Sequence, residues 1–209
     1  MNSKSYRTNE LFLRNGFESK GVFGFPFIRK QNLDLHNVDL IACSDTSTHD
    51  EYNLHKGVHF FVDDYRQTSI YYHPEKATEK YRKYKFVLTP DYSLYSEMDP
   101  WRQIESVAHS RWVGAYWQKE GLTVIPTISW AQPSSFRFCF ESVEKTSIVA
   151  VGMIGCKRKK IAFMKGYNAM LETINPSAII CFGTPFPEME GNIIPVDYRS
   201  TRKVVRHGR

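Results

Sequence analysis

The sequence predicts an α/β fold in a single domain, with a mainly parallel sheet flanked by helices. Beyond residue 57, short apolar runs alternate with helical patterns and end in short loops. This order is typical of a parallel sheet, because each pair of parallel strands needs a crossover connection. The 209 residues suffice for one well-packed core. We expect an open sheet rather than an incomplete barrel, since the chain shows only about six strands and a closed (β/α) barrel has eight.

The clearest strand–helix–strand unit spans residues 85–130. Its first strand is the apolar run Lys85–Thr89. Asp99 and Pro100 are a typical helix start, because Asp is a good N-cap and the missing N–H of Pro costs nothing at the first helical position. Gly121 ends the helix and the next strand follows directly. In open parallel sheets ligands bind outside the carboxyl ends of the strands, so this unit predicts a site there.

The rest of the chain supplies the other elements of the sheet. Further strands are expected at 38–42, 58–62, 147–151, 178–182 and 192–196, and further helices at 74–84 and 157–174. Pro195 indicates that the last strand lies at an edge, because Pro cannot donate to a ladder. We expect an irregular aromatic segment at 1–57 that packs on the core, an α/β region at 58–198, and a basic tail at 199–209.

Aspartates follow two of the expected strands. Asp63 and Asp64 come after one strand, and Asp91 after the next. Because successive strand side chains alternate, we expect only one of the adjacent pair to face a site. Carboxylates serve as general bases or nucleophiles, and Mg²⁺ prefers oxygen ligands, so magnesium stays open as a cofactor held by Asp63, Asp64 and Asp91. Alternatively, one Asp of the pair caps the next helical turn and the other pairs with Arg66.

Arg111 lies on the apolar stripe of the long helix. A buried charge is costly unless it is paired, which makes Asp91, Asp63 or Asp64 its expected partner. In that position Arg111 would orient a carboxylate or bind an anion. The alternative is that its long side chain reaches the solvent at the edge of the core.

Positive charge gathers in two places. A glycine loop precedes the helix 157–174, and backbone N–H groups at such a point favour anions. The tail 199–209 holds five Lys and Arg side chains of a chain whose net charge is +6. Solvated surface lysines are the alternative interpretation. The candidate phosphate-binding or nucleic-acid-binding residues are Gly155, Lys157, Arg158, Lys159, Lys160, Arg202, Lys203 and Arg206.

Composition bounds the cellular setting. No apolar run approaches the roughly 18 residues of a membrane span, and the N-terminus lacks the apolar core of a signal peptide. We therefore expect a protein of the bacterial cytoplasm with no membrane partner. The four cysteines form no C-x-x-C pair and are expected to be free, mostly buried thiols.

Several motifs resemble one catalogued family, the domain of unknown function 4417. They are HFFVDDYR (59–66), FVLTPDYSLYSEM (86–98), GAYWQKEGLTVIPTISW (114–130), FCF (138–140), SIVAVGMIGCK (147–157) and NPSAIICFG (175–183). The resemblance covers roughly residues 10–198. It implies a setting in phages or in bacterial mobile elements, and it implies no reaction.

Two classes of function follow. The first is an enzyme that acts on nucleic acid or nucleotides, a hydrolase or a glycosyl-transfer-type enzyme that uses the strand-end aspartates. The second is a non-catalytic nucleic-acid-binding or regulatory protein, or a phage factor that binds and inhibits a host protein. The sequence leaves open which class applies, and it leaves the oligomeric state open as well.

Overall fold

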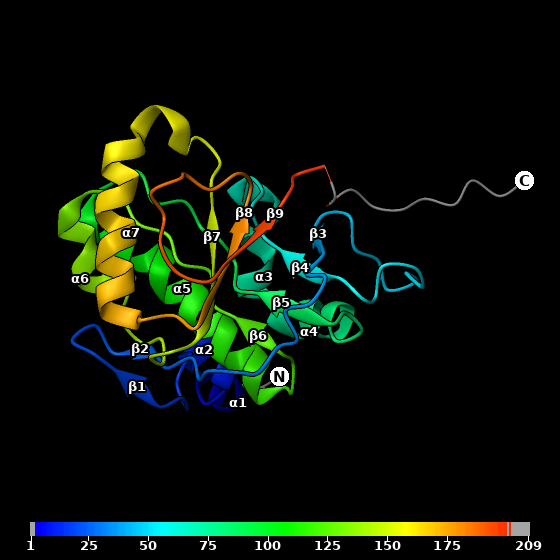
Figure 1. Cartoon of the computed structure of the whole chain (residues 1–209). Helices are drawn as coiled ribbons and strands as arrows, with labels where there is room; N and C mark the ends of the chain where they lie inside the picture. The colour runs from blue at the N-terminus through cyan, green and yellow to red at the C-terminus, as the bar shows by residue number, and fades with distance from the viewer. Residues whose placement is uncertain (1–2, 200, 202–209) are drawn as a thin grey trace, which may run out of the picture.

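The computed structural model describes residues 3–199 and 201, and it shows an α/β fold with two parallel sheets (Figure 1). The four-stranded sheet has the order β3-β4-β5-β6, and the three-stranded sheet the order β7-β8-β9. These strands are Leu40–Ala42, Gly57–His59, Phe86–Leu88, Val124–Ile125, Ile148–Gly152, Ala178–Phe182 and Ile193–Val196. All their pairings are parallel, which confirms the predicted fold class.

The two sheets meet just after β6. A parallel bridge pairs Thr127 with Ala150 of β7, and the Ile128 N–H donates to the Ala150 carbonyl at 2.8 Å. The edge strands β3 and β9 do not pair with each other in the described part of the chain, so the two sheets do not close into a barrel. Pro195 lies in β9, at the edge of its sheet, as the sequence predicts.

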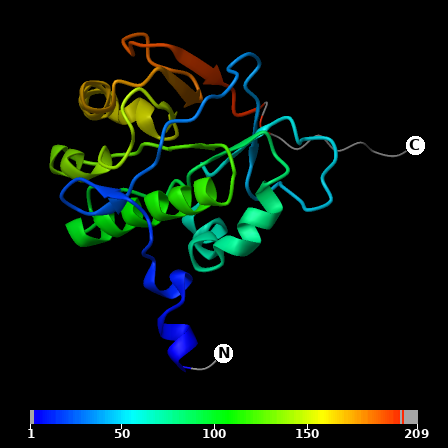
Figure 2. The same cartoon turned by 90° about the horizontal axis from the view of Figure 1, so that it is seen from below.

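Helices connect the parallel strands. The longest is α5 (Pro100–Lys119), the crossover from β5 to β6, which packs against α3, α4, α6, β2 and β6. The others are α1 (Ser3–Arg7), α2 (Glu10–Leu13), α3 (Thr68–Tyr72), α4 (Pro74–Tyr81), α6 (Phe136–Cys139) and α7 (Lys160–Ile174), with 3₁₀ turns η1 (Asp64–Arg66), η2 (Pro133–Ser135) and η3 (Cys156–Lys159). A short antiparallel pair, β1 (Ser19–Lys20) and β2 (Phe25–Pro26), precedes β3. The first two helices extend away from the body (Figure 2).

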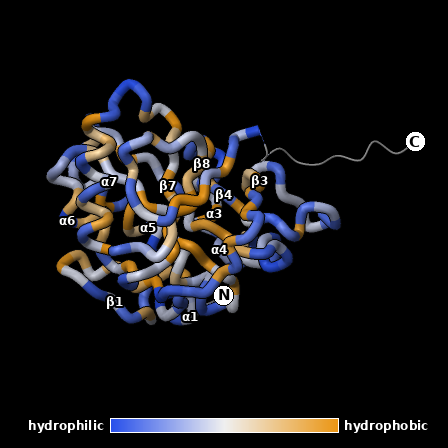
Figure 3. The backbone as a smooth tube through the Cα atoms, viewed as in Figure 1, coloured by the Kyte–Doolittle hydropathy of each residue, from blue (hydrophilic) through white to orange (hydrophobic). Residues whose placement is uncertain are grey.

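The three-stranded sheet is covered on both faces. Val149 and Val151 of β7 pack in the apolar cluster around α7, whereas Ala150 belongs to the cluster of the four-stranded sheet. Residues of β8 alternate in the same way, because successive side chains of a strand point to opposite faces. Burial on both faces explains the continuous apolar runs of β7 and β8, which lie in the middle of the molecule (Figure 3).

Several elements are shorter than the sequence predicts. The strand expected at 58–62 ends at His59, because the Phe61 N–H turns back to the Nδ1 atom of His59 at 3.2 Å. The helix expected from residue 157 begins only at Lys160, after a 3₁₀ turn that Gly155 initiates with φ 74°. The strand expected at 38–42 is shortened to β3 (Leu40–Ala42), which lies at the edge of its sheet.

Two further features concern the setting of the chain. The four cysteines are free thiols, and Cys43, Cys139 and Cys181 are buried. Among the described residues, no helix is both long enough and apolar enough to cross a membrane.

Candidate functional site

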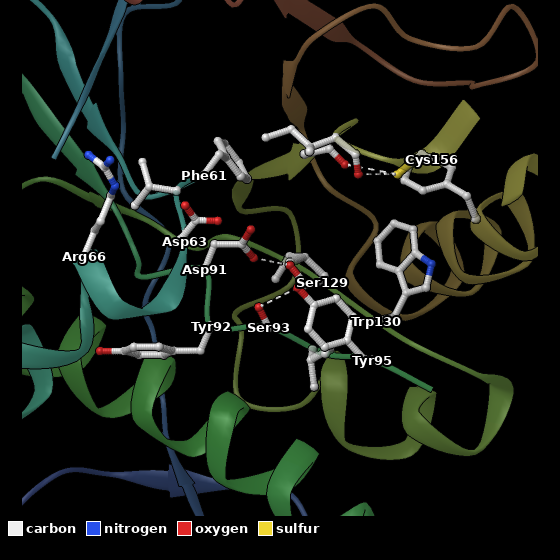
Figure 4. Close-up of a pocket in the computed structure, with 16 residues that line it drawn as sticks. Phe61, Asp63, Arg66, Asp91, Tyr92, Ser93, Tyr95, Ser129, Trp130 and Cys156 are labelled. Carbon is white, nitrogen blue, oxygen red and sulfur yellow. Dashed lines mark hydrogen bonds between the residues drawn. The ribbon is translucent and has the colours of Figure 1, made fainter. Parts of the chain in front are cut away.

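A cavity of about 520 Å³ opens where the strand ends of both sheets meet (Figure 4). Its walls come from the segments that follow β4, β5, β6 and β7. This is the position that a parallel sheet favours for ligands. Its aromatic walls are Phe61, Tyr92, Tyr95, Trp130 and Phe163, and its polar groups include Asp63, Arg66, Asp91, Ser93 and Ser129.

Gln67 fixes the backbone at Asp91. Its amide donates to the Asp91 carbonyl at 2.9 Å and accepts from the Asp91 N–H at 3.1 Å. The same amide donates to the carbonyls of Phe60 and Val62, so one fully buried side chain joins the chain after β4 to the chain after β5. Sequence reasoning missed Gln67, because nothing near it in the sequence reveals a contact with a residue 24 positions away.

The Asp91 carboxylate points into the cavity and accepts a hydrogen bond from the Ser129 hydroxyl (Figure 4). Burial raises the pKa of Asp91 to about 6, against the opposing effect of the Ser129 hydrogen bond and with a small contribution from the charge of Asp64. A carboxyl group with that pKa exists in both protonation states near neutral pH. It can therefore take up and release a proton during a reaction.

Asp63 and Asp64 diverge, but not through the alternation of strand side chains on which the prediction rests, because β4 ends at His59 and Asp64 opens η1. Asp63 is exposed and lines the cavity, close to Asp91 (Figure 4). The Asp64 carboxylate turns to the loop after β5. There it accepts hydrogen bonds from the Ser93 hydroxyl at 2.9 Å and from the Ser93 N–H at 3.2 Å. The alternative structural interpretation is wrong: Asp63 makes no side-chain cap on η1, and neither aspartate forms a salt bridge with Arg66, whose Nε donates to the hydroxyl of Tyr65.

The magnesium site that the spacing allows is not formed by three carboxylates. Within residues 3–199 and 201, no group of three or more His, Cys, Asp or Glu side chains could hold a metal ion. Asp64 is also committed to Ser93, which leaves Asp63 and Asp91 as the two carboxylates of the cavity.

Arg111 contradicts both expectations about its partner. It is buried, with 2 % of its surface exposed, and its guanidinium donates to the carbonyls of Cys139 at 2.7 Å, Glu141 at 3.2 Å and Thr127 at 3.4 Å. It neither reaches solvent nor pairs with an aspartate. Burial lowers its pKa to about 10, so it stays charged at neutral pH. Arg111 therefore holds the chain after β6 to the loop after α6, outside the main cavity.

The cations near Gly155 differ in their surroundings. Lys160 pairs with Glu188 at 2.5 Å. The pKa of Glu97 is lowered by hydrogen bonds from its own backbone and from Ser96 and, less strongly, by the charge of Lys159. Lys157 and Arg158 line a second, shallow cavity of about 710 Å³ together with Gly155. Arg202, Lys203 and Arg206 lie outside the described residues.

Cys156 also lines the main cavity, which the sequence did not reveal. Its thiol lies 3.6 Å from the carbonyls of Gly152 and Ile154. Burial raises the pKa of this thiol to about 11, so it is protonated and a poor nucleophile at neutral pH.

Comparison with known proteins supports the resemblance seen in the motifs. The sequence profile of the family described as "Domain of unknown function (DUF4417)" matches residues 17–199. The chain is similar to the Gene 1 protein of Mycobacterium phage L5, at 34% identity over 182 residues that cover 83% of this chain and 76% of the phage protein. It is also similar to the Gene 1 protein of Mycobacterium phage D29, at 33% identity over 178 residues that cover 83% of this chain and 65% of the phage protein.

No solved structure matches the chain. The profile match identifies the family, and the two relatives confirm the expected association with phages. The chain belongs to the DUF4417 family, whose members include proteins encoded by phages.

Proposed function

We propose that this protein is an enzyme that hydrolyses a glycosidic bond in a nucleotide, with Asp91 as the group that accepts a proton. The observation that carries the proposal is the carboxyl of Asp91. It is partly buried, it faces a cavity of about 520 Å³, and its pKa is raised to about 6. A pKa near the working pH is what general base catalysis requires.

The walls of the cavity fit a flat ring. The ring centroids of Trp130 and Phe163 lie 5.0 Å apart, and Tyr95 and Phe61 contribute further rings to the walls. Aromatic faces bind nucleobases by stacking, which tolerates any base. The hydroxyl protons of Ser93 and Ser129 are donated to Asp64 and Asp91, so these two hydroxyl oxygens and the carboxylate of Asp63 supply acceptors for the hydroxyl groups of a sugar.

The reaction balances as follows. Asp91 accepts a proton from water as the water oxygen forms a bond to the anomeric carbon of the sugar. The bond from that carbon to the base nitrogen breaks, and the nitrogen keeps the electron pair and takes up a proton from solvent. The products are a free base and the sugar phosphate. Asp91 then returns its proton to solvent, which restores the site.

Release of free base from nucleoside 5′-monophosphates, followed by chromatography, tests the proposal. The wild type should release base from at least one of them, and Asp91→Asn should lower the rate by roughly a hundredfold or more. Asp99→Asn is the matched control, because Asp99 is exposed, lies outside the cavity and makes no side-chain cap. The proposal is wrong if the wild type releases no base from any nucleoside 5′-monophosphate. It is also wrong if the Asp91→Asn variant is fully active.

A non-catalytic nucleic-acid-binding protein is the second candidate. It is favoured by exposed aromatic side chains, since Trp101 is 65% and Tyr95 59% exposed, and by the cations at 157–159. This reading predicts binding to single-stranded oligonucleotides that weakens steeply with salt and is lost when residues 199–209 are removed. Binding that salt leaves unchanged would exclude it.

A further inference from the structure

The loop 152–158 separates two cavities. Gly152, Ile154 and Cys156 line the main cavity, whereas Gly155, Lys157 and Arg158 line the shallow cavity of about 710 Å³. Ile154 lines both, and its side chain is 60% exposed. The two cavities are therefore neighbours across one exposed apolar side chain, and a ligand of moderate size can occupy both.

The second cavity carries positive charge without compensation. Lys157 and Arg158 form no hydrogen bond or salt bridge with any described residue, unlike Lys160, which pairs with Glu188. Both cations belong to the 3₁₀ turn η3, and no carboxylate among the described residues lies within salt-bridge distance of either. Their side chains are therefore available for an anionic ligand, and Arg binds phosphate through two parallel N–H donors.

Tyr198 also lines this cavity. Its ring packs edge-on against Phe182 with centroids 4.7 Å apart, which fixes its position. A Cβ at Gly183 would lie 2.5 Å from the Tyr198 hydroxyl, so Gly183 leaves the room that this ring occupies. The hydroxyl has no hydrogen-bond partner among the described residues and can donate to a phosphate oxygen.

We propose that the shallow cavity is a phosphate subsite, so that the ligand of the two cavities is a nucleoside monophosphate whose ring lies in the main cavity and whose phosphate contacts Lys157, Arg158 and Tyr198. This inference deepens the proposed function and rests on it for the position of the ring. It assigns to Tyr198 and Ile154 a place in the site: Tyr198 as a phosphate donor and Ile154 as the bridge over which the sugar passes.

Calorimetric binding measurements test the inference with the common nucleosides, their 5′-monophosphates and inorganic phosphate. They are made with Asp91→Asn, so that substrate is not consumed, and repeated with the wild type. A monophosphate should bind roughly tenfold tighter than its nucleoside, because charge-assisted hydrogen bonds to the phosphate are added. Lys157→Ala/Arg158→Ala should abolish that preference and leave the affinity for the nucleoside unchanged.

The matched control is Lys159→Ala/Lys165→Ala, which removes the same charge from exposed lysines that line neither cavity. It should keep the preference for the monophosphate. Tyr198→Phe should weaken the monophosphate by a few-fold without changing the nucleoside, since only the hydroxyl is lost.

The outcomes separate this inference from the proposed function. Equal affinity for a nucleoside and its monophosphate would contradict the phosphate subsite, but it would not contradict the proposed binding of the ring in the main cavity. Binding of inorganic phosphate through Lys157 and Arg158, with no binding of nucleoside, keeps the anion site but overturns the nucleotide assignment together with the proposed function. If an oligonucleotide binds far more tightly than any monophosphate, the inference is wrong and the two cavities belong to a surface that binds nucleic acid.

Discussion

The Ser129 hydroxyl donates a hydrogen bond to the Asp91 carboxylate, although the two residues are 38 positions apart in the chain. Ser129 follows β6 and Asp91 follows β5, and these two strands are paired in parallel. Their carboxyl ends therefore lie side by side, which brings hydroxyl and carboxylate together at the wall of the main cavity. This pair is the centre of the site that we propose.

Asp91→Asn should stabilise the fold at high pH. Burial raises the pKa of Asp91 from 3.8 to about 6, so the stability that the protonated form supplies is present below pH 3.8 and is lost as pH rises through 6. The loss amounts to about 3 kcal/mol above pH 6. Asn carries no charge and escapes this loss. Urea denaturation at pH 4 and pH 8 should show a gain in unfolding free energy at pH 8 only, whereas an equal change at both pH values would contradict the assignment.

His59 should make the fold less stable in acid, which is opposite to the effect of Asp91. Burial lowers the pKa of His59 from 6.5 to about 3, and its Nε2 atom has no hydrogen-bond partner. Stability is then fully present above pH 6.5 and falls as pH drops towards 3, by about 2 kcal/mol between pH 6.5 and pH 5.

The test of His59 is made in the Asp91→Asn background, because Asp91 acts with the opposite sign between pH 4 and pH 6. Denaturation at pH 7 and pH 5 should show the acid-dependent loss in that background and a much smaller loss once His59→Leu is added. Identical losses in both proteins would show that His59 does not titrate in this way.

Arg111→Met should destabilise the fold by about 2–4 kcal/mol, because it leaves two buried carbonyl groups and one partly buried carbonyl group without their donor. Those carbonyls belong to Thr127, Cys139 and Glu141. Arg111→Lys should recover only part of the loss, since one ammonium group cannot reach three acceptors as the guanidinium does. Thermal unfolding measures the effect, and Arg137→Met, a change at an exposed arginine, is the control. Stable folding of Arg111→Met together with lost activity would return Arg111 to the catalytic residues.

Gly166→Ala should disturb the wall of the cavity. A Cβ at this position would lie 2.2 Å from the ring of Trp130, so the ring must move. We expect a loss of about 1–3 kcal/mol in stability from overpacking, and a weaker affinity for any ligand that stacks on the ring. In a Trp130→Ala background the same change should cost little. Calorimetry and denaturation read both effects, and an unchanged affinity would show that Trp130 does not contact the ligand.

The sequence predicts the architecture well, because its signals are local. Asp99, Pro100 and Gly121 mark the ends of the long helix, and the structure places that helix at Pro100–Lys119. The apolar run at 178–182 forms β8 with those same bounds. The position of Asp91 at a strand end also follows from sequence, since a short apolar run stops just before it.

Contacts between distant segments were beyond sequence reasoning. Arg111 was expected to meet a carboxylate or to reach solvent, yet the backbone carbonyl groups of Thr127, Cys139 and Glu141 satisfy it, and such backbone contacts carry no sequence signal. Gln67 resembles any polar residue of a loop, although it joins two strand ends. The main cavity, which Cys156 lines, likewise depends on how the two sheets meet, and the wall formed by Tyr198 depends on how β7 and β9 lie within one sheet.

The role of Asp91 is tested most directly by the pH dependence of kcat/KM for release of free base from a nucleoside, which, unlike its 5′-monophosphate, has no phosphate group that ionises at about pH 6. We expect a rate that rises with pH and levels off above an apparent pKa of about 6, because Asp91 must be ionised to accept the proton. Asp91→Asn should abolish this ionisation along with most of the activity. A rate that is independent of pH between 5 and 8, or a wild-type ionisation that persists in Asp91→Asn, would contradict the role of Asp91.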